Sequence, residues 1–222
     1  MKWNRFLFIF VMAVFAENFA YCQELAPNNT TNSVLEERLR NAQVTEKKLG
    51  NGAVFTEVKF AGSLQPNVDL GCILIGEVTS AFNAPALIYA AKKCIQQDQY
   101  SKAWQLLSTG YGFAYYDITR LADRSAKGAR TVVAMNAFAD LTKAQQEGYQ
   151  RVANEMQADP EQVKAYCAEL TRIGPPTYEP MWAILHGIGV YQEPREGHYL
   201  TNVDTKALWE EVLRNRCTSK KS

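Results

Sequence analysis

The chain has 222 residues, of which 47% are hydrophobic and 21% are charged, and its formal net charge is +1. These values are ordinary for a folded protein and exclude a disordered or fibrous chain. Residues 1–22 hold two of the 24 basic and one of the 23 acidic residues, so their removal leaves 22 of each and no net charge. Such a chain has no electrostatic reason to seek nucleic acid or an anionic membrane. We therefore expect neither as a partner.

The first 22 residues have the three parts of a secretory signal. Lys2 and Arg5 supply a positive end, residues 6–16 form an uncharged apolar run of 11 residues, and small residues follow. The run is too short to cross a bilayer, which needs about 20 helical residues. The sequence therefore predicts an exported protein, either periplasmic or secreted.

Cleavage of this signal is compatible with a site after Ala16, Ala20 or Cys22, and we favour Cys22. Two alternatives stay open: a retained membrane anchor, and a lipoprotein in which Cys22 carries the lipid. Residues 19–21 fit a lipoprotein signal poorly, because that signal places leucine and small residues there. No later segment is apolar for long enough to span a membrane, so we expect no membrane contact after cleavage.

The chain has five cysteines, an odd number that is awkward in an oxidising compartment. Loss of Cys22 with the signal leaves four cysteines, which allow three pairings. The alternative is four buried free thiols. The remaining cysteines are Cys72, Cys94, Cys167 and Cys217.

One pairing is favoured by spacing along the chain. If residues 69–79 and 84–96 form an antiparallel pair, the cysteines of a Cys72–Cys94 bridge are equidistant from the turn and lie side by side. A Cys167–Cys217 bridge then follows by exclusion and ties the last helix to an earlier one. Each bridge contributes about 2–4 kcal/mol to stability.

The first third of the mature chain has few strong patterns. Residues 23–33 are polar and predict a flexible N-terminus, and a short helix capped by serine is expected at 34–43. A turn signal at 49–52 precedes residues 53–60, whose alternation of apolar and polar side chains predicts a short strand. Only one strand is convincing, so we expect no extended sheet. Residues 69–78 fit either a strand or a helix.

Residues 83–117 predict two helices back to back, around which the rest of the chain is organised. Asn83 is a suitable N-cap, and Pro85 is tolerated in the first turn of a helix. Apolar residues at helical spacing give each helix one buried face. In the second helix these residues are Tyr100, Ala103, Trp104, Leu107 and Tyr111.

The pattern Tyr100-x-x-Ala103, preceded by a helix of small residues, resembles one tetratricopeptide-type repeat. That family places Trp, Leu-Gly and Tyr in its first helix, where this chain has Leu87, paired alanines and Cys94. No second copy follows at the same period, and such repeats need neighbours for stability. The resemblance implies a single tetratricopeptide-like hairpin over residues 83–117 within a larger α-helical domain.

Further helices are expected after this hairpin. Residues 117–123 continue its second helix, and residues 126–141 form the next one. Their successors start at Asp140 or Thr142, Asp159, Pro180 and Asp204. The predicted fold is all-α, or mostly α with one short strand or hairpin near 53–60. It is a disulfide-stapled helical bundle in one domain, residues 34–217, with a frayed tail at 218–222.

Motifs for catalysis or metal binding are scarce. Neither His186 nor His198 has a second histidine or a cysteine at ligand spacing, and no phosphate, dinucleotide or nucleophile motif occurs. The sequence therefore predicts no metal and no cofactor. The enzymatic alternative is a polar cleft lined by Tyr178, Glu179 and His186. The opposing interpretation is a tight turn with Glu179 at a positive helix N-terminus and a buried histidine.

The densest aromatic cluster consists of Tyr111, Phe113, Tyr115 and Tyr116. Tyrosine buries a large apolar area and keeps a polar tip, which suits both a core and a protein interface. Two glycines in the same stretch would let a second backbone approach closely. We predict that these four side chains form a partner-binding surface; the alternative is that they pack in the core.

The predicted function is an exported, non-enzymatic protein-binding module: an adaptor, an assembly factor or an immunity-type inhibitor. Its partner is another protein of unknown identity, and the oligomeric state stays open. One alternative is a hydrolase acting on envelope material through Glu179 and His186. The other is a structural envelope protein that associates with itself.

Overall fold

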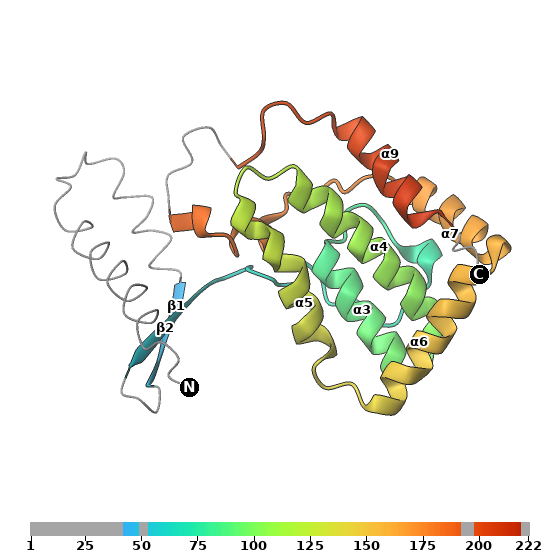
Figure 1. The fold of residues 1–222 in the computed structure, drawn as a ribbon, viewed down its shortest axis with the longest axis horizontal. Helices are drawn as coiled ribbons and strands as arrows, with labels where there is room; N and C mark the ends of the chain where they lie inside the picture. Colours follow the sequence, from blue (N-terminus) through green and yellow to red (C-terminus); the bar gives the residue numbers. More distant parts are fainter. Residues whose placement is uncertain (1–41, 49–52, 192–197, 219–222) are drawn as a thin grey trace, which may run out of the picture. The chain divides into compact units, whose positions relative to one another are not determined.

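The computed structural model describes residues 42–48, 53–191 and 198–218. All of them belong to the second of two units into which the chain divides, residues 41–222. The predicted signal peptide, the mature N-terminus up to residue 41 and residues 219–222 lie outside the described residues. Within the described ranges the protein is mostly helical, with seven α-helices and one two-stranded sheet, which confirms the predicted fold class (Figure 1).

The sheet is an antiparallel hairpin of β1, Ala42–Lys48, and β2, Val54–Phe60. The alternating residues of β2 predict that strand correctly. A second strand, β1, pairs with β2, as the hairpin alternative near 53–60 allows. The helix expected at 34–43 is wrong at its last two residues, which begin β1. β1 is mostly polar and shows no apolar alternation. Its backbone groups pair with those of β2 across the hairpin, and that pairing leaves no mark in the sequence.

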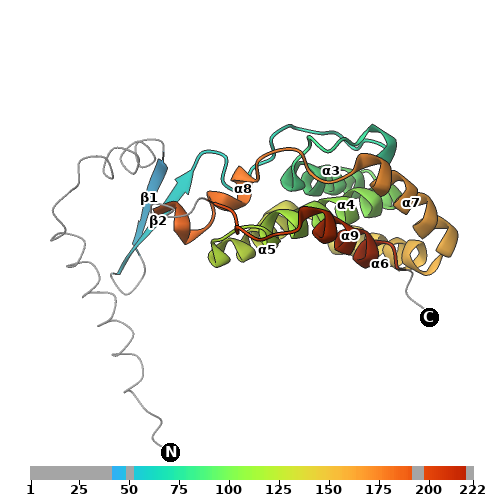
Figure 2. The same ribbon diagram turned by 90° about the horizontal axis from the view of Figure 1, so that it is seen from above.

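The expected helical hairpin is present as α3, Ala84–Gln96, and α4, Tyr100–Thr119, which pack side by side (Figures 1 and 2). The side chain of Asn83 caps α3 by accepting a hydrogen bond from the Ala86 N–H at 2.9 Å. Almost every residue of α3 up to Ile95 is buried, so this helix forms the centre of the core. Its small residues allow α4 to lie close against it.

Two glycines of α4 mark close helix contacts. A Cβ atom at Gly110 would lie 3.1 Å from Ile88 Cγ1 and 3.2 Å from Leu87 Cβ, both on α3. A Cβ atom at Gly112 would lie 3.1 Å from Val212 Cγ1 on α9, Thr205–Arg216. Helix α4 therefore lies between α3 and α9 (Figures 1 and 2). A backbone atom lies close only at Gly110, where the Ala84 carbonyl oxygen would be 3.3 Å from the Cβ atom, whereas the atoms near Gly112 belong to side chains.

Side-chain caps define the later helices. α5 is Ala129–Phe138, α6 is Lys143–Ala158 and α7 is Pro160–Ile173. Thr142, Asp159 and Asp204 cap α6, α7 and α9 by accepting hydrogen bonds from backbone N–H groups of the first turn. These caps confirm three predicted starts and select Thr142 over Asp140. Gly174, with φ of 75°, ends α7.

Three helix boundaries differ from the prediction: the end of α4, the start of α5 and the end of the helix after Pro180. Near each of them, side chains accept hydrogen bonds from backbone N–H groups. α4 ends at Thr119 and does not reach residue 123, since Asp123 instead caps a 3₁₀ turn, Arg124–Gly128, that precedes α5. After Pro180 only Met181–Ile184 is α-helical, as α8, and a 3₁₀ turn follows at Ile188–Tyr191. The N–H groups of Ile188 and Gly189 donate to Ser125 Oγ and Asp123 Oδ2, both at 2.7 Å, rather than to a continuing helix.

The segment 69–78 is neither a strand nor an α-helix. It contains one 3₁₀ turn, Ile75–Glu77, and is otherwise irregular. Arg172 on α7 donates to the carbonyl oxygens of Ile75, Gly76 and Val78, at 3.2–3.4 Å, and thus supplies partners for backbone groups that no helix satisfies. The segment is held by long-range contacts, which its own sequence does not reveal.

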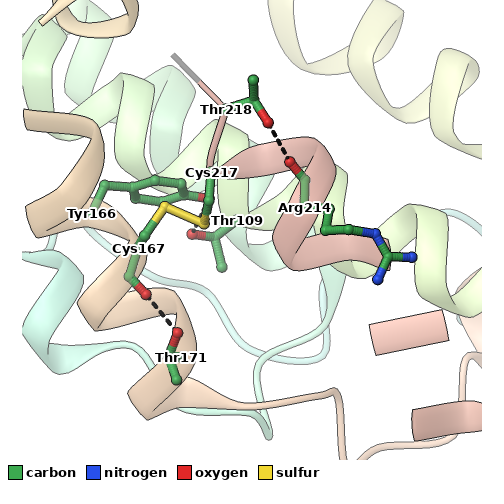
Figure 3. Close-up of a disulfide and its surroundings, with 7 residues drawn as sticks. All are labelled: Thr109, Tyr166, Cys167, Thr171, Arg214, Cys217 and Thr218. Atoms are coloured by element: carbon green, nitrogen blue, oxygen red, sulfur yellow. Dashed lines mark hydrogen bonds between the residues drawn. A yellow bond between two sulfur atoms is a disulfide. The ribbon is translucent and has the colours of Figure 1, made fainter. Parts of the chain in front are cut away.

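Both predicted disulfides are present. Cys72 and Cys94 are bonded with their Cα atoms 4.7 Å apart, and Cys167 and Cys217 with theirs 5.7 Å apart. The second bond joins α7 to the residue that follows α9, as Figure 3 shows. Two disulfides in a chain of this size are typical of a protein that folds in an oxidising, extracytoplasmic compartment. Among the described residues, none of the helices is both long and apolar enough to cross a membrane.

Candidate functional site

A carboxylate lies in the core, at the C-terminal end of α4. The side chain of Asp117 is fully buried. Its Oδ2 atom accepts hydrogen bonds from the Tyr178 hydroxyl at 2.7 Å and from the indole Nε1 of Trp182 at 3.0 Å. Its Oδ1 atom lies 3.3 Å from the guanidinium of Arg120. Burial of a charge is tolerated here because donors surround it.

Tyr178 connects three parts of the fold. Its hydroxyl donates to Asp117 and accepts from the N–H of Ala84, the first residue of α3, at 3.1 Å. The loop that carries it is fixed at Thr177, whose N–H donates to the carbonyl of Ser80 at 3.0 Å. One phenol therefore joins the start of α3, the end of α4 and the loop after α7. This is a structural role, and it uses the hydroxyl that a catalytic cleft would need.

Arg120 lies between two aromatic rings beside this carboxylate. Its guanidinium carbon is 4.8 Å from the ring centre of Tyr116 and 5.1 Å from that of Tyr199. Cation–π contacts of this kind stabilise by about 0.5–2 kcal/mol, depending on desolvation. The Nε atom of Arg120 is buried and has no hydrogen-bond partner in the described part of the chain. The rings and Asp117 together hold the charge.

The pKa of Asp117 is raised from 3.8 to about 6. Burial is the main cause, since it penalises the charged form. Hydrogen bonds from Tyr178 and Trp182, and then the charge of Arg120, oppose the rise without cancelling it. The pKa of Tyr178 is raised well above its ordinary value by burial and by Asp117. Asp117 is thus a group whose protonation changes near neutral pH.

The three candidate catalytic residues occupy different environments. Tyr178 points into the core, Glu179 is exposed, and His186 is half-buried in the turn after α8. Burial lowers the pKa of His186. Among the described residues, no hydrogen bond or ion pair joins these three side chains to one another. Within the same part of the chain, no group of three or more His, Cys, Asp or Glu side chains gathers that could hold a metal ion.

The aromatic cluster of α4 divides into two pairs. Phe113 and Tyr116 are core residues, and both rings pack against Trp209 of α9, with centres 6.0 and 5.9 Å away. Tyr111 and Tyr115 are half-buried. These two side chains form what we call the Tyr111–Tyr115 face.

Each tyrosine of the Tyr111–Tyr115 face has a polar neighbour on another helix. The Tyr115 hydroxyl donates to Glu211 Oε1 on α9 at 2.5 Å. The guanidinium carbon of Arg130, on α5, lies 5.7 Å from the ring centre of Tyr111. Tyr111 and Tyr115 are four residues apart and therefore lie on the same side of α4. Arg130 of α5 and Glu211 of α9 flank that side of the helix. The face therefore combines aromatic rings with charged groups of both signs.

Asp117, Arg120 and Trp182 were not predicted as interacting residues. One signal was available for Asp117: a carboxylate in the last turn of a helix opposes the helix dipole and needs an explanation. No comparable signal exists for Arg130, because its neighbour Tyr111 is distant in the sequence. Comparison of the chain with models of known protein families, with curated proteins and with solved structures finds no match.

Proposed function

We propose that this chain is an exported, non-enzymatic protein-binding module that presents the Tyr111–Tyr115 face to a partner protein. The signal-like N-terminus and the two disulfides support a periplasmic or secreted location. Within this proposal the α3–α4 pair serves as the scaffold, as the helical pair does in a tetratricopeptide-type repeat. The partner is a protein of the same compartment, which the module helps to assemble or inhibits.

The observation that carries the proposal is the half-burial of Tyr111 and Tyr115 on a rigid helix. Both tyrosines have their rings anchored against neighbouring helices and keep part of their surface accessible. Aromatic side chains that are already ordered lose little entropy on binding, which is why tyrosine and arginine are frequent in binding hot spots. Phe113 and Tyr116 are excluded from this role by their burial.

The hydrolase alternative receives less support from the contacts. Its three side chains are not joined, and the Tyr178 hydroxyl already donates to Asp117. Self-association through the Tyr111–Tyr115 face is a distinct alternative, and light scattering addresses it. A dimer that Tyr111→Ala dissociates would favour it over a separate partner.

The test is recovery of bound proteins from an envelope extract by the immobilised full chain. We expect Tyr111→Ala and Tyr115→Ala to reduce recovery of the partner at least about tenfold, the effect of losing one hot spot. Tyr89→Ala is the matched control, because Tyr89 is a half-buried tyrosine on the other helix of the same hairpin. Equal recovery by all three variants would contradict the proposed surface.

A further inference from the structure

Four side chains that carry hydrogen-bond donors converge beside the Tyr111–Tyr115 face. Arg130 of α5 lies over the ring of Tyr111. The Cγ and Nε atoms of Arg216 would be 3.7 and 3.9 Å from a Cβ atom at Gly112, so this arginine lies across α4 next to Tyr111. The charge of Arg216 acts on both Tyr111 and Arg130, and Tyr149 of α6 lies within electrostatic reach of Tyr111. We call these four side chains the donor cluster.

The donor cluster has no paired acceptor in the part of the chain that the structure describes. Within the described residues, no carboxylate pairs with Arg130 or Arg216, and no hydrogen bond engages the hydroxyl of Tyr111 or Tyr149. All four side chains are nevertheless half-buried. Other partly buried cations of this fold do have partners: Arg120 is paired with Asp117, and Lys92 with Asp140.

Burial and the repulsion between like charges both disfavour the charged form of Arg216 in the donor cluster. Burial, first, and the neighbouring charge of Arg130 lower the pKa of Arg216, while the tyrosines at positions 166 and 111 raise it. Burial raises the pKa of Tyr111 and of Tyr149, so both hydroxyls stay protonated and can donate. The two arginine charges repel each other, and an oxyanion that contacts both guanidinium groups would offset this repulsion.

The position of Arg216 is fixed by its neighbour in sequence. Cys217 is bonded to Cys167 of α7, so the end of α9 cannot move away from α7 (Figure 3). The hydroxyl of Tyr166, next to Cys167, lies 3.4 Å from Thr109 Oγ1 of α4, which holds the same junction from the other side. The backbone that carries Arg216 is therefore held in place, which lowers the entropy lost when this arginine binds a ligand.

We propose that Arg130, Arg216, Tyr111 and Tyr149 form a binding site for an oxyanion. A guanidinium pairs with carboxylate or phosphate oxygens in a fixed geometry, and the phenol hydroxyls add neutral donors. The oxyanion is either a free phosphate-type anion or an acidic side chain of a protein. The second source deepens the proposed function and rests on it, because Tyr111 belongs to both surfaces; the first source does not depend on it.

The experiment measures binding of two probes to the full chain with its disulfides intact. Inorganic phosphate and a polyglutamate peptide are titrated by calorimetry and by thermal shift, against sodium chloride of equal ionic strength. The variants are Arg130→Gln, Arg216→Gln and Tyr149→Phe. The matched control is Arg214→Gln, because Arg214 is an exposed arginine on the same helix, two residues away.

We expect at least one probe to bind the wild type and Arg214→Gln equally. Either arginine variant of the cluster should weaken binding by about tenfold or more, which is the effect of losing one charge-assisted contact. Without probe, Arg216→Gln should melt no earlier than the wild type, because it removes the repulsion between the two guanidinium groups. A purely structural Arg216 would instead lower the melting temperature when replaced. Tyr149→Phe keeps the ring and provides a variant whose folding is not in question.

The outcomes separate this inference from the proposed function. Binding of phosphate that depends on Arg130 and Arg216 supports the site with a free anion as its source. Binding of polyglutamate alone, with the same dependence, supports an acidic side chain. Equal binding by all variants, or no binding of either probe, overturns the site. Cluster-dependent phosphate binding, together with partner recovery that Tyr111→Ala leaves unchanged, would retain the site and reject the Tyr111–Tyr115 face.

Discussion

The titration of Asp117 offers a direct test of how the core is built. The pKa of this carboxyl is about 6 in the folded chain, against 3.8 ordinarily, because burial penalises its charge more than the surrounding donors stabilise it. The folded state therefore binds the proton more tightly than the unfolded state. The resulting stability is fully present below pH 3.8 and is lost as the pH rises through about 6.

The size of this loss of stability follows from the difference between the folded and ordinary pKa values of Asp117. At 1.36 kcal/mol per pKa unit, the charged carboxylate lowers the free energy of unfolding by about 3 kcal/mol at neutral pH. Between pH 7 and pH 5 about 1 kcal/mol of this loss should be regained, since the folded chain takes up the proton first. Most acidic groups in folded proteins have lowered pKa values and stabilise the fold more as the pH rises. A fall in the free energy of unfolding between pH 5 and pH 7 would therefore identify a carboxyl with a raised pKa.

The assay is urea unfolding of the oxidised chain at several pH values between 5 and 7, compared with Asp117→Asn. The asparagine variant does not titrate at this position, so the difference between the two chains isolates Asp117. Asp140→Asn is the matched control and should give a curve parallel to the wild type, because a hydrogen bond from Lys92 lowers the pKa of Asp140 below 3.8 and its stabilisation is lost only at pH values under this range. If the wild type and Asp117→Asn gave parallel curves between pH 5 and 7, the pKa of Asp117 in the folded chain would not be about 6 and the reasoning would be refuted.

Two further predictions concern the two disulfides and the close contact between α4 and α3 at Gly110. Replacing Cys167 and Cys217 by serine removes a link across 50 residues and should cost about 4 kcal/mol on the loop-entropy scale. The link across 22 residues made by Cys72 and Cys94 should cost about 3 kcal/mol. Urea unfolding measures both, and no loss in either variant would contradict the reasoning. Gly110→Val should lower the free energy of unfolding by about 1–3 kcal/mol, because the Cβ atom alone would lie 3.1–3.3 Å from α3 atoms. Gly71→Val is its control, since a Cβ atom there meets nothing within 4 Å.

The parts of the fold that were predictable depend on contacts between residues near in sequence. Asn83, Thr142, Asp159 and Asp204 each bond a backbone N–H two or three residues ahead, so their side chains alone determine where a helix begins. Apolar residues at helical spacing then indicate which face of each helix is buried. The disulfide pairing was accessible for a different reason, since four cysteines allow only three arrangements.

The unpredicted parts depend on contacts across long sequence separations. β1 is a strand because β2 pairs with it, and within the irregular segment 69–78 Arg172 donates to three carbonyl groups, those of Ile75, Gly76 and Val78. The expected helix after Pro180 is short because Asp123 and Ser125 capture its backbone donors. In each case a polar group from elsewhere competes with local hydrogen bonding, and no local pattern records it.

The same distinction applies to the candidate sites. The sequence by itself determined that α4 carries an aromatic cluster, since Tyr111 and Tyr115 are simply present there. Only the tertiary structure decided which rings are buried, that Asp117 is a core carboxylate, and that Arg130 of α5 and Arg216 of α9 both lie against α4, at Tyr111 and Gly112. The physical reason is that burial and charge proximity are properties of packed surfaces, and residues far apart in the chain acquire them only when the helices meet.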